Sequence, residues 1–295
     1  MTFVTFSLMY EDGSGIARAT LGLNATPEAV EAQMVRLGLD RPLLVQYWDW
    51  LTGAVTGDLG RSFYTSESVV SALATRVPVT LSELVITLIL ATMISVVLGV
   101  VAAVRGGWVD RVVQFFTVLG NAIPAYVIAI ILVFTLAVTW RLFPATGYVP
   151  LSENPGLWIR SLTLPVIALS LGALGGIASQ FRTAVLDTLG RDYTRTLRAR
   201  GVKESEIVFR NVLRNAAAPG LTAISLTMIG LLGGTIFIEQ IFAIPGMGQL
   251  ANSAAQISDV PMVMGTVLVT ILIVLVVNFL SDLGITLLNP KARRQ

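Results

Sequence analysis

The side chains that most often carry chemistry are scarce in this sequence. The chain has 295 residues and contains neither cysteine nor histidine. Zinc, haem and iron–sulfur sites rely on these two residues, as do cysteine nucleophiles and the base of a Ser-His-Asp triad. A P-loop for nucleotide phosphates needs a lysine after a glycine-rich turn, and neither Lys203 nor Lys291 follows such a turn. The sequence therefore predicts that the chain is not an enzyme and that it binds no cofactor or metal itself.

Ionisable residues are also rare inside the apolar segments. Glu83, Glu239 and Asp282 lie toward the ends of such segments. A carrier driven by a proton or sodium gradient normally places an ionisable residue near the middle of the membrane. The pattern argues against such a carrier, so any uphill movement is expected to draw its energy from a partner protein.

The composition indicates a membrane protein. Hydrophobic residues make up 54% of the chain and charged residues 13%, with a mean hydropathy of +0.77, whereas a soluble domain has roughly 25% charged residues. A hydrocarbon core about 30 Å thick requires about 20 apolar residues in a helix. Five stretches are long enough: Val79–Val104, Val112–Trp140, Leu162–Leu186, Leu221–Phe242 and Met262–Leu288. The predicted fold class is an all-α integral membrane protein.

The two ends and the basic residues predict the topology. Residues 1–10 are apolar but give only about 15 Å of helix, so we expect the outer end of a truncated first span or a segment along the interface. Thirteen of the 20 lysines and arginines fall in Arg105–Arg111, Arg182–Arg214 and Lys291–Arg294. Alternating spans place these three segments on one side, which the positive-inside rule assigns to the cytoplasm. Residues 11–78 are then outside and the C-terminus inside.

Residues 11–78 are predicted to be helical. Thr26 is a suitable N-cap for a helix that Gly38 can end. A second helix is expected to follow. Its apolar face is predicted from residues three or four positions apart, Leu44, Tyr47, Trp48 and Leu51. Trp48 and Trp50 fit two alternatives equally well, packing within this region or lying at the membrane interface.

Small residues and prolines interrupt the apolar spans. Gly172 and Gly176 form a small-xxx-small pair, as do Gly230 and Gly234. Such pairs let helices approach closely, and packing in a bundle is favoured over a role in gating. Pro124 lies within the predicted second span and is expected to kink it around a cavity.

The most informative segment lies between the third and fourth complete spans. A basic helix is predicted to end at Arg200, and Gly201 separates it from a second helix, with Pro219 eighteen residues further on. Glycine is favoured at such a break because it tolerates positive φ. The flank of the second helix is predicted from Val208, Val212 and Asn215, with Phe209 and Leu213 beside it. A helix–turn–helix between spans can dock into a groove on a partner.

This segment resembles a known motif. Residues 193–219 are similar to the coupling loop, often called the EAA loop, of ABC importer permeases, and the order Arg-Thr-x-Arg-Ala-Arg-Gly that ends at Gly201 is similar to their dipeptide/oligopeptide branch. Other segments resemble the same family in order along the chain: Asn24–Glu28, Leu37–Pro42, Gly57–Ser62, Ile123–Pro124, Phe143–Gly147 and Glu239–Gly248. The sequence departs from the family pattern at Asn211, where a histidine is frequent, and at Asn289, where an aspartate is usual.

The resemblance implies a type I ABC importer permease with five complete transmembrane helices and a truncated first one. The permease domain would cover residues 79–290, with the coupling loop at about 187–219 and a cytoplasmic tail at 291–295. The resemblance implies contacts to an ATPase from Arg195, Leu197, Arg198, Ala199, Gly201, Val202 and Glu204. It also suggests gate or pathway residues, namely Asn121, Pro124, Glu239, Pro245, Gly246 and Gly248.

The implied function is that of one half of the translocation pathway of an ATP-driven importer for dipeptides or oligopeptides in a bacterial inner membrane. The implied partners are a second homologous permease, two ATPase subunits that bind ATP and Mg, and an extracytoplasmic substrate-binding protein; no nucleic acid is expected. One alternative is the same type of permease for nickel complexes or glutathione. Alternatives from other classes are a receptor or scaffold and a membrane-embedded enzyme, although the spans offer no paired catalytic groups.

Overall fold

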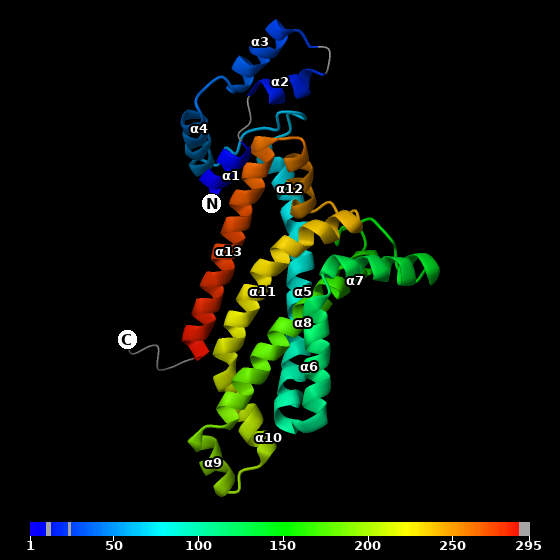
Figure 1. The fold of residues 1–295 in the computed structure, drawn as a ribbon, viewed down its shortest axis with the longest axis vertical. Helices are drawn as coiled ribbons and strands as arrows, with labels where there is room; N and C mark the ends of the chain where they lie inside the picture. The colour runs from blue at the N-terminus through cyan, green and yellow to red at the C-terminus, as the bar shows by residue number, and fades with distance from the viewer. Residues whose placement is uncertain (10–12, 23–24, 289–295) are drawn as a thin grey trace. The chain divides into compact units, whose positions relative to one another are not determined.

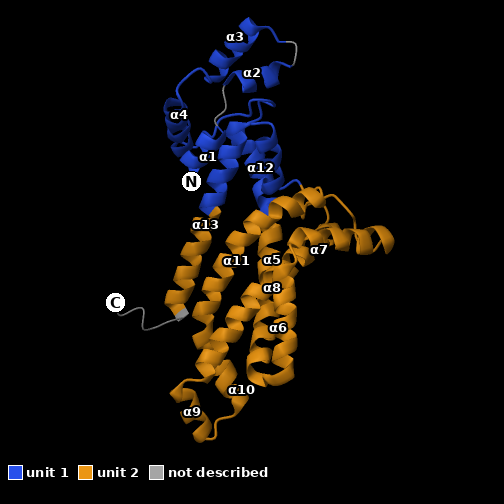
Figure 2. Cartoon of the chain, in the orientation of Figure 1, with its two compact units in different colours: residues 1–80, 245–272 blue, residues 81–244, 273–295 orange. Residues whose placement is uncertain are grey.

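The protein is represented by a computed structural model, which describes residues 1–9, 13–22 and 25–288. Over these residues the regular structure is helical, apart from one isolated β-bridge between Arg61 and Ser68 (Figure 1). The chain divides into two compact units (Figure 2). Unit 1 comprises residues 1–80 and 245–272, and unit 2 comprises the remainder. Tyr10 and the predicted tail at 291–295 lie outside the described residues.

Unit 1 contains a set of short helices. They are α1 (Thr2–Met9), α2 (Gly13–Leu21), α3 (Pro27–Leu37), α4 (Leu43–Val55) and α12 (Met247–Gln256). The predicted caps of α3 are confirmed: the Thr26 side chain accepts a hydrogen bond from the Ala29 amide, and Gly38 has φ of +70°. The helix in this region is therefore delimited by local signals that a sequence displays directly.

The predicted apolar face of α4 is correct for Tyr47 and wrong for Leu44 and Trp48. Leu44 and Trp48 are 66% and 62% exposed. Tyr47 packs instead with Leu43 and Trp50 against an apolar cluster that includes Phe6 and Val260. Trp50 therefore follows the packed alternative and Trp48 does not. The face of an apolar helix is decided by which neighbours are available, and here these come from distant parts of the chain.

A buried carboxylate joins the loop before α5 to the segment before α13. The Ser62 hydroxyl donates to Asp259 Oδ2 at 2.5 Å, and the Phe63 amide donates to Oδ1 at 3.2 Å. Ser62 Oγ also accepts hydrogen bonds from the amides of Tyr64 and Thr65. Burial raises the pKa of the Asp259 carboxyl, while the hydrogen bonds that it accepts act in the opposite direction.

Unit 2 is built from long apolar helices. They are α5 (Val69–Arg105, which begins in unit 1), α6 (Gly107–Ala122), α7 (Ala125–Leu132), α8 (Pro155–Leu189), α11 (Leu213–Ile241) and the second part of α13 (Val260–Leu288). The π-helix η1 (Val133–Thr139) continues α7, and α9 (Asp192–Ala199), α10 (Glu204–Glu206) and the π-helix η2 (Ile207–Val212) link α8 to α11. Among the described residues, four helices are long and apolar enough to cross a membrane, or five if a bent pair counts as one span.

Three predicted span limits that lie at prolines differ in the structure. The predicted second span breaks at Ile123–Pro124, where α6 and the segment 125–139 make an angle of 93°. A proline lacks the amide that a helix requires and disfavours helical geometry in the residue before it, and Ile123 is extended. In contrast, α5 runs through Pro78 and begins ten residues earlier than predicted, and α11 runs through Pro219.

The helix α8 forms the core of unit 2. Within its most apolar window 67% of the residues are buried, against 28–33% in the other three long helices. Three glycines allow neighbouring backbones to come close to it. A Cβ at Gly99 on α5 would lie 2.8 Å from the Ala178 carbonyl oxygen, one at Gly175 would lie 2.5 Å from the Thr117 oxygen of α6, and one at Gly220 on α11 would collide with the Phe181 ring.

An ion pair adds to this contact between α6 and α8. Arg182 Nε and Nη2 each donate to Asp110 at 2.5 Å, and both side chains are less than a quarter exposed. With its amide oriented to satisfy both groups, Gln114 accepts two further hydrogen bonds from Arg182. The bidentate geometry fixes the relative position of the two helices.

We predict that Gly99→Ala destabilises the protein whereas Gly233→Ala does not. A helical Gly→Ala change ordinarily gains about 1 kcal/mol, and a Cβ at Gly233 meets nothing within 4 Å. At Gly99 the methyl group would press on α8 backbone, and overpacking of this kind costs about 1–3 kcal/mol. Thermal unfolding in detergent should show a lower midpoint for Gly99→Ala alone. Equal midpoints for the two variants would contradict the proposed close packing.

Candidate coupling turn and translocation cavity

Two backbone hydrogen bonds and a positive φ at Gly201 end the helix α9. The Gly201 amide donates to the Arg198 carbonyl at 2.9 Å, and the Val202 amide donates to the Leu197 carbonyl at 3.2 Å. These two bonds, with Gly201 at φ of +78°, make a Schellman motif, in which glycine is favoured because a Cβ strains the left-handed conformation. The predicted break at Gly201 and its positive φ are confirmed.

An ion pair spans the same turn. Arg198 donates to both carboxylate oxygens of Glu204, at 3.0 Å from Nε and 2.5 Å from Nη2. Both side chains remain close to half exposed, so the pair contributes little to stability. Its bidentate geometry instead orients α9 relative to the start of α10.

The turn rests on the ends of α5 and α8. Leu197 and Val202 pack against a buried cluster formed by Ala103 of α5, Ala184 and Val185 of α8, and Ile207, Val212 and Ala216. The Thr194 hydroxyl donates to the Thr188 carbonyl at 2.9 Å, which fastens α9 to α8. A displacement of the turn is therefore transmitted to α8 through close-packed side chains.

The other side chains of this segment are partly exposed and partly buried. Arg195 and Ala199 are exposed, and Arg195 lies 3.8 Å from Asp192. Of the predicted flank of the second helix, Val208 and Val212 are buried, Phe209 is exposed, and Asn215 donates to the Tyr193 hydroxyl. The predicted coupling residues thus divide into a packed pair, a charged pair and exposed positions.

A cavity of about 360 Å³ lies where α6 breaks from α7. Asn121 and Pro124, two of the predicted pathway residues, line it together with residues of α8 and α11. The lining side chains carry no charge, and the polar ones are Asn121 and Thr227. An interrupted helix also leaves backbone carbonyls without helical partners. The cavity therefore offers small surfaces and neutral hydrogen-bonding groups.

The paired glycines line this cavity. Gly172, Gly176, Gly230 and Gly234 all contribute to its wall. A Cβ at Gly176 or Gly230 would meet nothing within 4 Å, so these two do not serve close packing inside this chain. The predicted role in bundle packing therefore fits Gly172, which lies against Ala125, but does not fit Gly176 and Gly230.

The predicted gate residues after α11 occupy different positions. Glu239 is fully buried in the last turns of α11. The chain then turns, with Ala243 at φ of +50°, and Gly246 precedes α12, whose first amide, that of Met247, donates to the Thr80 hydroxyl at 2.8 Å. Pro245 and Gly248 belong to unit 1, whereas Glu239 belongs to unit 2.

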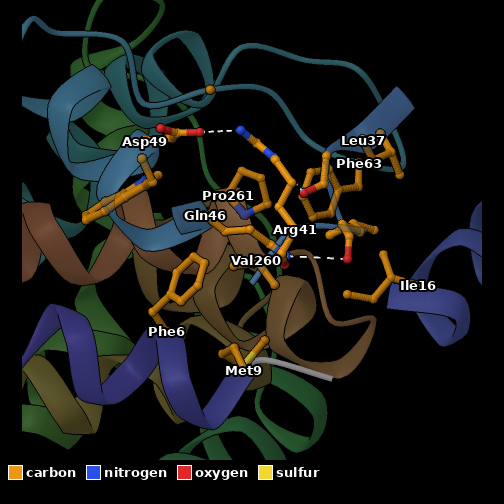
Figure 3. Close-up of a pocket in the computed structure, with 14 residues that line it drawn as sticks. Phe6, Met9, Ile16, Leu37, Arg41, Gln46, Asp49, Phe63, Val260 and Pro261 are labelled. Atoms are coloured by element: carbon orange, nitrogen blue, oxygen red, sulfur yellow. Dashed lines mark hydrogen bonds and ion pairs between the residues drawn. The ribbon is translucent and has the colours of Figure 1, made fainter. Parts of the chain in front are cut away.

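Unit 1 contains a cavity that the sequence did not indicate. It measures about 280 Å³ and is lined chiefly by apolar side chains, among them Phe6, Phe63 and Val260 (Figure 3). Arg41 extends along the cavity and forms an ion pair with Asp49. Its lining residues come from segments far apart in the chain, so no local motif could have revealed it.

Comparison with known proteins identifies the family. Residues 95–294 match the family described as "Binding-protein-dependent transport system inner membrane component", and residues 1–84 match the N-terminal family of such membrane components. A putative peptide transport system permease protein of Brucella abortus is 38% identical over 99% of this chain and 94% of its own length. The oligopeptide transport system permease protein AppB of Bacillus subtilis is 35% identical over 87% of this chain and 82% of its own length.

The fold also has a solved counterpart. A chain of the MetNI methionine ABC transporter, solved in inward-facing conformations, superposes with a TM-score of 0.61 at 19% identity, covering 75% of this chain and 97% of that one. This likeness shows the type I permease fold that the sequence predicted. With matches to the family over most of its length, the chain belongs to the inner membrane components of binding-protein-dependent transport systems.

Proposed function

We propose that this chain forms one half of the membrane pathway of an ATP-driven importer for dipeptides or oligopeptides. The observation that carries the proposal is the physical link between two sites of unit 2. The Gly201 turn packs on the end of α8, and α8 supplies part of the wall of the 360 Å³ cavity. The family assignment and the names of the peptide permease relatives support the choice of function.

The proposed mechanism uses α8 as a lever. An ATPase that closes on ATP pushes on the exposed face of α9 and the Gly201 turn. Leu197 and Val202 transmit this push to the buried cluster at the end of α8. Rigid helices that rock against a second permease then alternate the access of the cavity between the two sides of the membrane.

The proposed partners follow from this mechanism. A second homologous permease completes the pathway, two ATPase subunits bind ATP and Mg, and a substrate-binding protein delivers the peptide outside. The exposed α9 provides the contact for the ATPase, and the predicted topology places it and the C-terminus in the cytoplasm of a bacterial cell. In this proposal the chain itself binds no cofactor and catalyses no reaction.

Short peptides suit the cavity better than charged complexes. Its lining has no charged side chain and no side chain of a type that prefers nickel. Asn121, Thr227 and backbone groups can instead hydrogen-bond the peptide backbone, which every peptide shares. The test is to measure uptake into proteoliposomes that contain the purified complex. Equal rates for peptides that differ in their side chains would support peptides as the substrate.

We expect Gly201→Asp to abolish peptide uptake without loss of the protein from the membrane. The left-handed φ costs a Cβ residue about 1–2 kcal/mol, and the position has open space within this chain, so the added side chain would project toward the ATPase. Uptake and peptide-stimulated ATP hydrolysis should both be lost. Gly190→Asp is the matched control, since Gly190 has an ordinary helical φ of −76°.

Gly201→Asn separates the two causes of this defect. Asparagine tolerates the left-handed conformation but still adds bulk. If docking is the cause, the asparagine variant also loses uptake at normal abundance. Normal transport and coupling in Gly201→Asp would show that this turn does not contact the ATPase.

The ion pair across the turn gives a second prediction. Reversing one charge, in Arg198→Glu or Glu204→Arg, should reduce peptide-stimulated ATP hydrolysis several-fold because like charges then face each other across the turn. The double reversal restores the pair and should recover most of the activity. A double variant no better than the single ones would exclude an orienting role for the pair.

The cavity gives a third prediction. Gly176→Leu should fold normally, because a Cβ there meets nothing within 4 Å, but its side chain would fill part of the 360 Å³ cavity. Uptake should fall most for the longest peptides. Gly233→Leu, an exposed glycine with equal space outside the cavity lining, is the control. Equal uptake by both variants would remove the cavity from the pathway.

A further inference from the structure

Another cavity of unit 2 carries positive charge. It measures about 460 Å³ and is lined by residues of the loop after η1 and of the first turns of α8. Two arginines, Arg141 and Arg160, line this arginine pocket, and its lining contains no acidic side chain. Among the residues that the structure describes, neither arginine forms an ion pair. Two cations that share a cavity without a carboxylate are suited to an anionic ligand.

Backbone contacts bring the two arginines to one place. Arg160 Nη2 donates to the Leu142 carbonyl at 2.9 Å, which ties the first turns of α8 to the residue after Arg141. The Leu142 amide donates in turn to the Leu136 carbonyl at 2.8 Å and fastens the same residue to η1. Both arginines therefore extend from backbone that is held at the junction of η1 and α8.

Arg141 occupies a conformation in which glycine would be favoured. Its φ is +53°, and it comes directly after the end of η1, where many helices end on a left-handed glycine. A residue with a Cβ is strained in this conformation. An arginine at such a position points to a role for its side chain, because the turn itself would be better served by glycine.

A tyrosine adds a further hydrogen-bond donor to the pocket. The Tyr148 oxygen accepts a hydrogen bond from Trp158 Nε1 at 3.2 Å, which leaves the phenolic hydrogen for a ligand. The guanidinium of Arg160 uses one of its five N–H groups on the Leu142 carbonyl and retains the others. Guanidinium groups bind phosphate through two parallel hydrogen bonds, and a phosphate has several oxygens to accept them. This set of donors therefore suits a phosphate group.

The pocket lies where the chain leaves one apolar segment and enters the next. Arg141 follows the predicted span that ends at Trp140, and Arg160 lies two residues before the span that begins at Leu162. Large apolar side chains in and beside the lining are exposed, namely Trp140, Leu142, Leu157 and Ile159. Aromatic rings and arginines are found together at the level of the lipid headgroups. The phosphate that is abundant at this level belongs to a phospholipid.

We propose that the arginine pocket binds the headgroup of an anionic phospholipid. Arg141, Arg160 and Tyr148 donate to the oxygens of its phosphate, and its acyl chains lie along the exposed apolar side chains. A headgroup that carries its own positive charge fits poorly, because the lining offers no carboxylate to pair with it. Phosphatidylglycerol has no such charge and is the lipid class that fits. The bound lipid connects the end of η1 with the start of α8.

The test is photocrosslinking of the purified transporter complex in detergent micelles. The probe is phosphatidylglycerol with a photoreactive group in its acyl chain close to the glycerol, and the labelled peptides are identified by mass spectrometry. Wild type should be labelled within residues 141–161. An excess of unlabelled phosphatidylglycerol should prevent this labelling, whereas the same excess of phosphatidylcholine should compete several-fold less.

Two arginine variants test the donors. Arg141→Gly and Arg160→Gln should each reduce the labelling of residues 141–161 several-fold. Glycine tolerates the left-handed conformation at position 141, so Arg141→Gly is expected to fold normally and a loss of labelling reports the missing side chain. Arg105→Gln is the matched control and should be labelled like wild type, because Arg105 is an exposed arginine at the end of α5 and lies outside the pocket lining.

Several results would overturn the proposal. Absence of labelling in wild type, or its persistence in both arginine variants, would show that the two arginines hold no lipid. Equal competition by phosphatidylcholine would exclude selection of an anionic headgroup. Displacement by millimolar inorganic phosphate would identify a site for a small anion, and displacement by the substrate-binding protein would assign the arginines to that partner. Labelling requires no transport, so a failure of peptide uptake would contradict the proposed function alone.

Discussion

The close approach of three helices to α8 determines the rest of unit 2. Without glycine at positions 99, 175 and 220, the backbones of α5, α6 and α11 could not reach it at the observed separations. Apolar attraction between helices is weak in lipid, because lipid tails are as apolar as the side chains, so contact area and small residues decide which helices associate. The Arg182–Asp110 pair then fixes the position of α6 along α8.

This packing explains why a turn at one end of α8 and a cavity along it can act together. The cluster around Val185 and Ile207 excludes water and leaves little space for the turn to move independently. Farther along α8, Gly172 and Gly176 line the cavity beside the break at Pro124. The helix α8 therefore has two features that the proposed function needs. One end packs rigidly against the coupling turn, and small residues farther along it line the cavity.

Local signals in the sequence predicted a large part of this structure. The caps of α3, the turn at Gly201 and the existence of the spans all depend on residues adjacent in the chain. The sequence predicted a kink at Pro124 but not its angle of 93°, because a proline indicates where a helix is interrupted and not the direction that the next segment takes. The packed face of α4 depends on contacts with distant segments, which a single sequence does not display.

In the proposed lever, α8 and the coupling turn move as one body. The chain contains no cysteine, so cysteines introduced at Thr183 of α8 and Thr196 of α9, both exposed, can carry spin labels in a complex with cysteine-free partners. Pulsed electron resonance then measures the distance between the labels without nucleotide and with ATP bound. We predict the same distance distribution in both states. A shifted mean or a second population with ATP would show that the turn moves independently of α8 and would contradict the proposed lever.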